Sequence, residues 1–267
     1  MEKFTTSLPP APGPAEPSGA QTVSRAIHAL KLIASRHTEG VRLVDVADAL
    51  GLTRPTAHRL LKTLTEEGLL RRLGATRRYV LGALVFELGL AAAHNFNLVD
   101  MCRPTLQRLA ERTSDTSFLF VRSGNDSVCL DRIQGTFPIQ TPSVPVGSRQ
   151  PLGVNAGGLA LLCALGDGEA RAVAEACAPC LGVYAGLDAD ELLRIRQRAR
   201  NLGYALIGNR AVPGVTAVGL PVISHSGAAI AAITVATTSS RMTQPRIDEI
   251  LPHLRDAARE IAQLLRQ

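Results

Sequence analysis

A short apolar helix, a glycine and a second helix with its own cap restrict the fold of this chain more than any other feature. The apolar spacing predicts a helix over Val44–Leu50, and Gly51 is the residue type favoured just beyond a helix end. Thr53 is then placed to cap a helix that runs to about Glu67, with Pro55 in its first turn, where a missing N–H has no cost. Two short helices joined by a tight turn are typical of a helix-turn-helix.

The flanking segments complete a small domain around this motif. Apolar residues recur at three- and four-residue spacing in Thr22–Arg36, which predicts an amphipathic helix, and Val41–Leu43 could form a short strand. Leu69–Arg72 and Arg77–Leu81 have the composition of a β-hairpin, in the position of a wing. We therefore expect a winged helix-turn-helix over residues 21–82.

The charge of the chain is concentrated in the same segment. Residues 21–82 contain eleven Lys and Arg against five Asp and Glu, a net charge of +6, which is also the formal net charge of all 267 residues. A basic segment beside a neutral remainder indicates a module that binds a polyanion. Charge alone leaves open a helical hairpin with a merely solvated basic surface.

The second helix of the motif predicts which side chains would reach DNA. At about 100° per residue, one stripe is apolar and buried: Ala57, Leu60, Leu61 and Leu64. Arg54 and Arg59 could each pair with a guanine edge, while Arg77 and Arg78 in the hairpin would meet phosphates or a minor groove. The predicted contacts to double-stranded DNA are Arg25, Thr53, Arg54, Pro55, Thr56, His58, Arg59, Lys62, Arg77, Arg78 and Tyr79.

The rest of the chain predicts a tail, a connecting helix and a second domain. Residues 1–20 are rich in Pro, Gly, Ala and Ser and are expected to be disordered, and an apolar helix over Ala83–His94 belongs to a linker that ends at residue 97. Residues 98–267 alternate helices and strands, and so predict an α+β domain with an antiparallel sheet. The expected elements are helices over Leu98–Arg112, from near Asn155 and over Ala189–Leu202, paired strands over Ser117–Arg122 and Ser127–Ile133, and a hairpin of Val215–Ile223 and Ala228–Thr237.

The last helix has one apolar stripe, with Pro252 inside it. We expect a kink or a late start of the helix there, because a proline removes a backbone hydrogen bond.

Blocks of sequence in both domains resemble the IclR family of transcriptional regulators, in the family's order. The blocks are Thr22–Ala26, Leu43–Ala47, Gly51–Leu61, Arg78–Gly82, Val146–Leu152, Gly203–Ala205, Val212–Val215 and Leu220–Val222. The resemblance extends over about residues 20–265. It implies a GAF-like effector-binding domain after the winged helix, and a homodimer or homotetramer on a palindromic operator, most often as a repressor. A transcriptional activator of the same family is the alternative.

The resemblance also implies a pocket for a small-molecule effector, often an organic or aromatic acid. By position it maps to Ile139, Gln150, Asn155, Ala156, Gly157, Ile207, Val215, Ala217, Thr234 and Ala236. The sequence departs from the family there, since Ile207–Arg210 stand where relatives have acids, and Ala217 and Ala236 where relatives often have Cys and Ser. We therefore expect a less polar pocket, for a larger or aromatic carboxylate or a lactone-like molecule. Arg210 could pair with such an anion or lie on the surface.

The start of the helix after Asn155 has two interpretations. Asn155 can cap this helix, and without bulky side chains at Gly157 and Gly158 its first N–H groups would be open to a carboxylate. Alternatively, the two glycines only allow close packing.

The five cysteines leave a second kind of signal open. They are scattered and odd in number, which suits a reducing compartment rather than a disulfide framework. Cys177 and Cys180 form a CxxC that could sense redox state or bind zinc, although two further zinc ligands are missing at suitable spacing. We therefore expect no metal and no cofactor.

Other classes of function have less support. The six histidines form no recognisable catalytic grouping, and neither a phosphate-binding glycine loop nor a Gly-x-Ser-x-Gly elbow occurs, so no catalytic residues are expected. A ligand-free architectural DNA-binding protein would not require the long second domain. No apolar run is long enough to span a bilayer and the N-terminus does not resemble a secretory signal, so we expect no membrane partner and a cytoplasmic location.

Overall fold

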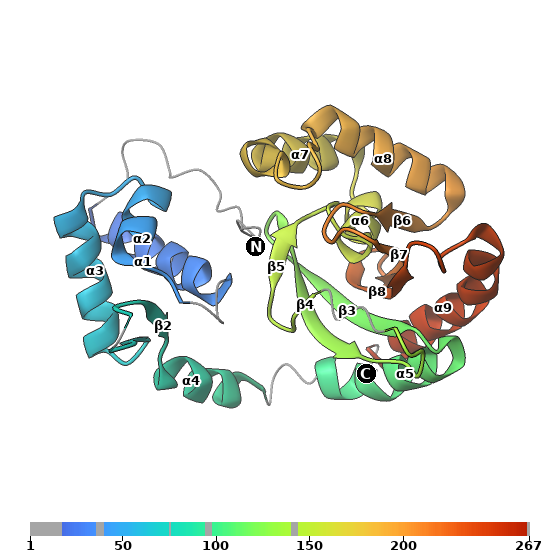
Figure 1. Cartoon of the computed structure of the whole chain (residues 1–267), viewed down its shortest axis with the longest axis horizontal. Helices are drawn as coiled ribbons and strands as arrows, with labels where there is room; N and C mark the ends of the chain where they lie inside the picture. The colour runs from blue at the N-terminus through green and yellow to red at the C-terminus, as the bar shows by residue number, and fades with distance from the viewer. Residues whose placement is uncertain (1–17, 36–39, 75, 94–97, 140–143, 266–267) are drawn as a thin grey trace. The chain divides into compact units, whose positions relative to one another are not determined.

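The computed structural model describes residues 18–35, 40–74, 76–93, 98–139 and 144–265 (Figure 1). The chain forms two compact units, and the second begins at Leu98.

The first unit is a helix-turn-helix followed by a two-stranded wing and an apolar helix. Its elements are α1 (Ser18–Ser35), α2 (Leu43–Ala49), α3 (Arg54–Glu66), β1 (Leu70–Arg72), β2 (Tyr79–Leu81) and α4 (Ala83–Ala93). The strands pair antiparallel, with Leu70 opposite Leu81. Ile33, Leu61 and Leu70 are fully buried, so one apolar core joins α1, α3 and the wing.

The start of α2 corrects one expectation. Val41 makes an isolated antiparallel bridge with Tyr79, but Leu43 is already helical, so the predicted strand over Val41–Leu43 is wrong. The backbone N of Arg42 donates to Oδ2 of Asp45 at 3.2 Å, and its guanidinium Nη2 lies 2.9 Å from Oδ1. Because Asp45 accepts both of these hydrogen bonds, Arg42 is held as the N-cap and α2 begins at Leu43.

The second unit is an α+β domain built on one antiparallel sheet in the order β5-β4-β3-β8-β7-β6 (Figure 1). Its strands are β3 (Thr116–Ser123), β4 (Asp126–Ile133), β5 (Arg149–Pro151), β6 (Ala205–Gly208), β7 (Val215–Ile223) and β8 (Ala229–Thr238). Its helices are α5 (Leu98–Thr113), α6 (Ala156–Cys163), α7 (Asp167–Leu181), α8 (Ala189–Leu202) and α9 (Gln244–Leu264). The predicted fold class is confirmed.

The two faces of this sheet pack against different helices. Alternation along β8 directs Ile233 and Val235 into a core with α5 and α9, while Ala232 and Ala236 face α6. α6 packs directly on the sheet, and α7 and α8 pack against each other beside it (Figure 1). The face toward α6 carries the candidate pocket described below.

Several boundaries differ from the sequence prediction. Ser18–Ala20 were expected in the tail but are the first residues of α1. The rest of the predicted tail lies outside the described residues, as does His94, the predicted last residue of the connecting helix. α9 begins at Gln244, well before Pro252, so the late start is wrong. The sequence prediction missed β5, β6 and α7.

Candidate nucleic-acid interface and ligand pocket

The N-terminal half of α3 presents polar and basic side chains to solvent. Arg54, His58 and Arg59 are exposed, while Ala57 and Leu61 on the opposite side are buried. Within the described residues, the side chains of Arg54 and Arg59 make no hydrogen bond or ion pair, so their guanidinium donors are available to a ligand. This is the face that the sequence predicted to be solvent-exposed.

The other predicted residues of α3 lie on or beside the same face. Pro55 and Lys62 are exposed, and Nζ of Lys62 lies 3.5 Å from Glu66 Oε1, a loose pair. Thr53 occupies the N-cap, but its hydroxyl is 2.9 Å from the hydroxyl of Thr56 instead of bonding a backbone N–H. The first turn of α3 therefore keeps its N–H donors open to a phosphate.

In the wing, the predicted contact residues have different environments. Arg77 is exposed, with φ of 53°, whereas Arg78 is half-buried and its Nη1 donates to the carbonyl of Gly40 at 3.0 Å. Tyr79 is only 5% exposed and packs in the core, so it is removed from the candidate DNA-binding surface. Arg78 thus anchors the wing, and Arg77 is free to meet DNA.

Three more arginines of the first unit are candidates for this DNA-binding surface. Arg25 is half-buried on α1, while Arg71 and Arg72 in β1 are both exposed. The guanidinium of Arg72 lies 5.9 Å from the ring centroid of Tyr79. The sequence prediction counted Arg71 and Arg72 in the basic charge but did not assign them to the site. Their position in a predicted wing strand next to a turn was the signal that could have added them to the predicted DNA contacts.

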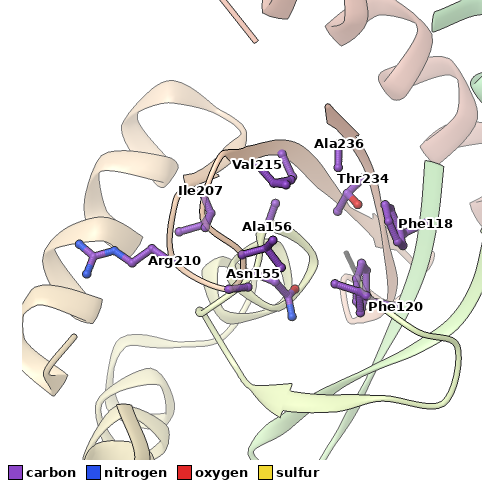
Figure 2. Close-up of a pocket in the computed structure, with 13 residues that line it drawn as sticks. Phe118, Phe120, Asn155, Ala156, Ile207, Arg210, Val215, Thr234 and Ala236 are labelled. Atoms are coloured by element: carbon purple, nitrogen blue, oxygen red, sulfur yellow. The ribbon is translucent and has the colours of Figure 1, made fainter. Parts of the chain in front are cut away.

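A pocket lies between α6 and the sheet of the second unit (Figure 2), with about 410 Å³ of empty space when the adjoining open solvent is included. It is lined by Phe118, Phe120, Val144, Asn155, Ala156, Ile207, Arg210, Ala211, Val212, Val215, Ala217, Thr234 and Ala236. Ten of these thirteen residues are apolar, and the polar ones are Asn155, Thr234 and Arg210. Pockets with such a lining bind small organic molecules whose orientation is set by a few polar groups.

Seven of the ten predicted pocket residues line it, and three do not. Ile139 is 60% exposed. Gln150 is buried but lies behind the lining, where its Oε1 accepts from Asn155 Nδ2 at 2.7 Å. Gly157 faces the ring of Phe120: an added Cβ would lie 2.2 Å from Cδ2 of that ring.

The predicted cap of α6 is confirmed and explains how Asn155 is held. Its Oδ1 accepts from the backbone N of Gly158 at 2.7 Å, and its Nδ2 donates to Ser127 Oγ at 2.9 Å as well as to Gln150. At Gly158 an added Cβ would lie 3.0 Å from Ser127 Oγ. Both glycines therefore serve close packing, and the N–H of Gly158 is already used within the protein.

The sequence prediction missed the aromatic wall and the loop residues of the pocket. Phe118 and Phe120 have ring centroids 5.9 Å apart, and the residues of the loop after β6 include Ala211 and Val212. Alternation in β3 puts the two rings on one face of the sheet, but sequence does not say which helix covers that face. Thr234, a residue only 1% exposed, adds a polar side chain to the lining.

All five cysteines belong to the second unit, and none of them lines the pocket. Cys177 and Cys180 are not joined in a disulfide, and burial raises the pKa of the Cys177 thiol to about 12. The described part of the chain holds no group of three His, Cys, Asp or Glu side chains suited to a metal. A thiol with so high a pKa is a poor nucleophile and a poor metal ligand at neutral pH.

A winged helix-turn-helix with an exposed basic helix, joined to an α+β domain with a pocket, is the architecture of a two-domain transcriptional regulator. Residues 90–263 match the family described as bacterial transcriptional regulator IclR C-terminal, and residues 22–74 match the IclR helix-turn-helix domain. The chain belongs to the IclR family of DNA-binding transcriptional regulators. Its described residues contain no helix long and apolar enough to cross a membrane.

Characterised relatives are similar along nearly the whole chain. The HTH-type transcriptional regulator XynR of Escherichia coli (strain K12) is 28% identical over 246 residues, which cover 92% of this chain and 97% of XynR. The HTH-type transcriptional repressor AllR of the same strain is 28% identical over 262 residues, 95% of this chain and 94% of AllR.

Solved structures share the fold. An IclR regulator from Silicibacter sp. TM1040 has a TM-score of 0.77 at 23% identity and covers 91% of this chain and 95% of its own. An IclR homologue from Microbacterium hydrocarbonoxydans, complexed with 4-hydroxybenzoate, has a TM-score of 0.66 at 24% identity and covers 92% and 99%.

Proposed function

We propose that this protein is a repressor whose affinity for its operator is changed by a small, largely apolar carboxylic acid bound in the second unit. The observation that carries this proposal is the pocket itself, which has an apolar and aromatic wall with Asn155, Thr234 and Arg210 as its polar lining residues. Such a lining favours an aromatic or other apolar body over a very small, polar oxoacid.

Two relatives support the ligand class and the direction of control. The Microbacterium homologue was crystallised with 4-hydroxybenzoate, an aromatic carboxylate that serves as a first probe. AllR is named a repressor. A lactone is the second kind of probe, because it offers oxygen acceptors without a full charge.

On the DNA, α3 is proposed to enter the major groove with its N-terminal half. Arg54 and Arg59 are exposed and unpaired within the described residues, and each can present two parallel donors to O6 and N7 of guanine. Arg71 and Arg77 in the wing are placed to neutralise phosphates, which contributes affinity but little sequence preference.

Self-association is proposed to occur through α4. This helix exposes Phe86 (69%) and, one turn further along the same face, Leu90 (55%); nothing in the first unit covers them among its described residues. Exposed apolar surface of this kind marks an interaction site. Two copies paired here would carry two α3 helices, which accounts for a palindromic operator and a homodimer.

Ligand control requires that the acid bind one arrangement of the two DNA-binding units better than the other. Because the proposed target is the chromosome, we place the protein in the cytoplasm.

The proposal is tested by titrating aromatic carboxylates and lactones into the full chain and following binding by calorimetry. One of these compounds is expected to bind and to weaken operator binding by the same protein. If no member of either class bound, the proposed ligand would be wrong. If a compound bound and tightened operator binding, the direction of control would be wrong.

A further inference from the structure

The pocket has one charged side chain at its edge. Among the thirteen lining residues, Arg210 alone is ionised, and no acidic residue lines the pocket. Arg210 is carried by the loop after β6, which is closed by a hydrogen bond from the backbone N of Gly214 to Asn209 Oδ1 at 2.7 Å. Asn209 itself has a left-handed backbone, with φ of 57°. The loop therefore holds the base of Arg210 at the pocket in a defined geometry.

The guanidinium of Arg210 is directed away from the pocket in the structure. Figure 2 shows it beyond Ile207, on the side opposite Phe118 and Phe120. Its Nη2 lies 3.6 Å from Glu191 Oε1 on α8, and its Nη1 donates weakly to the carbonyl of Ala185 at 3.4 Å. Both distances are long, and partly exposed ion pairs of this kind contribute little to stability.

Glu191 does not depend on Arg210 for its charge balance. Its other carboxylate oxygen accepts a hydrogen bond from Arg194 Nε at 2.9 Å. If Arg210 turned away from α8, Glu191 would still be paired with Arg194. The cost of moving the Arg210 guanidinium is therefore small, and its long flexible stem allows the rotation.

We propose that Arg210 determines specificity for anionic ligands: its guanidinium leaves Glu191 and binds the carboxylate of an apolar monocarboxylic acid in the pocket. The acid's apolar body then packs against Phe118 and Phe120, at the far end from its charged group. An arginine pairs with a carboxylate through two parallel hydrogen bonds, and a neutral analogue cannot accept them as well. Glu191 competes with the ligand for Arg210 and so lowers the affinity. This inference rests on the proposed function and names the side chain that selects its ligand.

The test compares an acid with its neutral analogue on matched variants of the full chain. Calorimetry with 4-hydroxybenzoate and with 4-hydroxybenzyl alcohol gives an acid-to-alcohol affinity ratio for each variant. R210Q is expected to weaken binding of the acid by about tenfold and to leave binding of the alcohol unchanged. R210K, which retains a charge without the planar fork, is expected to fall between R210Q and the wild type.

Substitutions of the competing pair separate a ligand role from a structural one. E191Q is expected to tighten binding of the acid about threefold, since the loss of a partly exposed pair is a small effect. It should have no such effect in the R210Q background, as measured by a double-mutant cycle. R198Q is the matched control: Arg198 is an exposed arginine on the same helix as Glu191 and does not line the pocket, so the acid-to-alcohol ratio should stay unchanged.

Each outcome decides between this inference and the function it rests on. If the acid binds and R210Q leaves the affinity ratio unchanged, or weakens both probes equally, Arg210 is not the selecting residue and the proposed function stands. If 4-hydroxybenzoate and the other aromatic carboxylates of the panel fail to bind the wild type, the proposed ligand class and this inference fall together.

Discussion

Arg59 gives the most direct test of which face of α3 contacts DNA. It is exposed and has no partner among the described residues, so its substitution removes nothing from the protein's own packing. Arg59→Ala is expected to weaken specific operator binding by about 1–3 kcal/mol and to leave Tm unchanged. The measurement is fluorescence anisotropy on a labelled operator.

Arg198→Ala provides the control for Arg59→Ala, because it also removes one positive charge from an exposed helix face, on α8. It is expected to leave operator affinity nearly unchanged. Equal losses in the two variants would mean that only total charge matters, and that α3 faces DNA differently.

The Cys177 thiol provides a pH test of the redox alternative. Its pKa is raised to about 12 by burial first, and further by the nearby Asp126. The thiolate is the reactive form, so alkylation of Cys177 in the folded protein should be slow at pH 8 and accelerate only as pH approaches 12, whereas the unfolded protein should react readily near pH 8.5. Alkylation rates mapped by mass spectrometry check this. Rapid reaction at pH 8, with a change in operator affinity on oxidation, would restore redox sensing.

The sequence predicts buried and exposed positions of α3 better than it predicts which side chains meet in the pocket. Leu61 and Arg59 fall where helical periodicity puts them. Tyr79 and Gly157 were assigned by position alone, and tertiary packing uses them otherwise, in the core and against Phe120. Arg210 was left undecided, because only the loop conformation brings its stem to the pocket.

At the scale of single elements, the beginning of α6 is held close to the sheet by Gly157. An added Cβ would lie 2.2 Å from the Phe120 ring, so Gly157→Ala must displace the ring or the helix. We expect a loss of about 1–3 kcal/mol of unfolding free energy and weaker ligand binding, because overpacked cores strain their neighbours. Urea unfolding followed by circular dichroism measures the first effect.

A second glycine is a control of the same kind for Gly157→Ala. Gly168 is the second residue of α7, as Gly157 is of α6, and an added Cβ at Gly168 would meet nothing within 4 Å. Gly168→Ala is expected to be neutral or to stabilise by about 0.4–1 kcal/mol. If the two variants behaved alike, the close approach of α6 to Phe120 would not be a constraint.

Elements with strong local signals were predicted well, and short edge strands were not. α8 has the predicted bounds Ala189–Leu202, because Asp188 caps it, accepting from the backbone N of Glu191 at 2.7 Å, and Gly203 ends it with φ of 76°. β5 and β6 span three and four residues, too short for an alternating pattern, and owe their conformation to pairing with β4 and β7.

At the scale of the whole molecule, α4 is the element proposed to join two copies. Phe86→Ser is expected to raise the dissociation constant for self-association by about tenfold or more, since a buried aromatic side chain contributes roughly 1.5–3 kcal/mol. Sedimentation velocity over a range of protein concentrations measures it. Val183→Ser, which alters another apolar side chain that is 58% exposed but lies outside α4, should have no effect. Equal self-association of Phe86→Ser and the wild type would exclude this face.

Self-association and operator binding are linked in this account. A dimer presents two α3 helices to two half-sites, so Phe86→Ser should also lose affinity for a palindromic operator more than for a single half-site. This comparison distinguishes a dimer on a palindrome from two independent monomers.

The most direct test of the central claim is the binding of the full chain to a DNA site that it selects from genomic fragments, with and without 4-hydroxybenzoate and related acids. We predict specific binding that becomes weaker as salt rises from about 50 to 200 mM, because phosphate contacts release counterions. At fixed salt, one of the acids is expected to weaken this binding further. No selected site, or specific binding that none of these acids changes, would contradict the account.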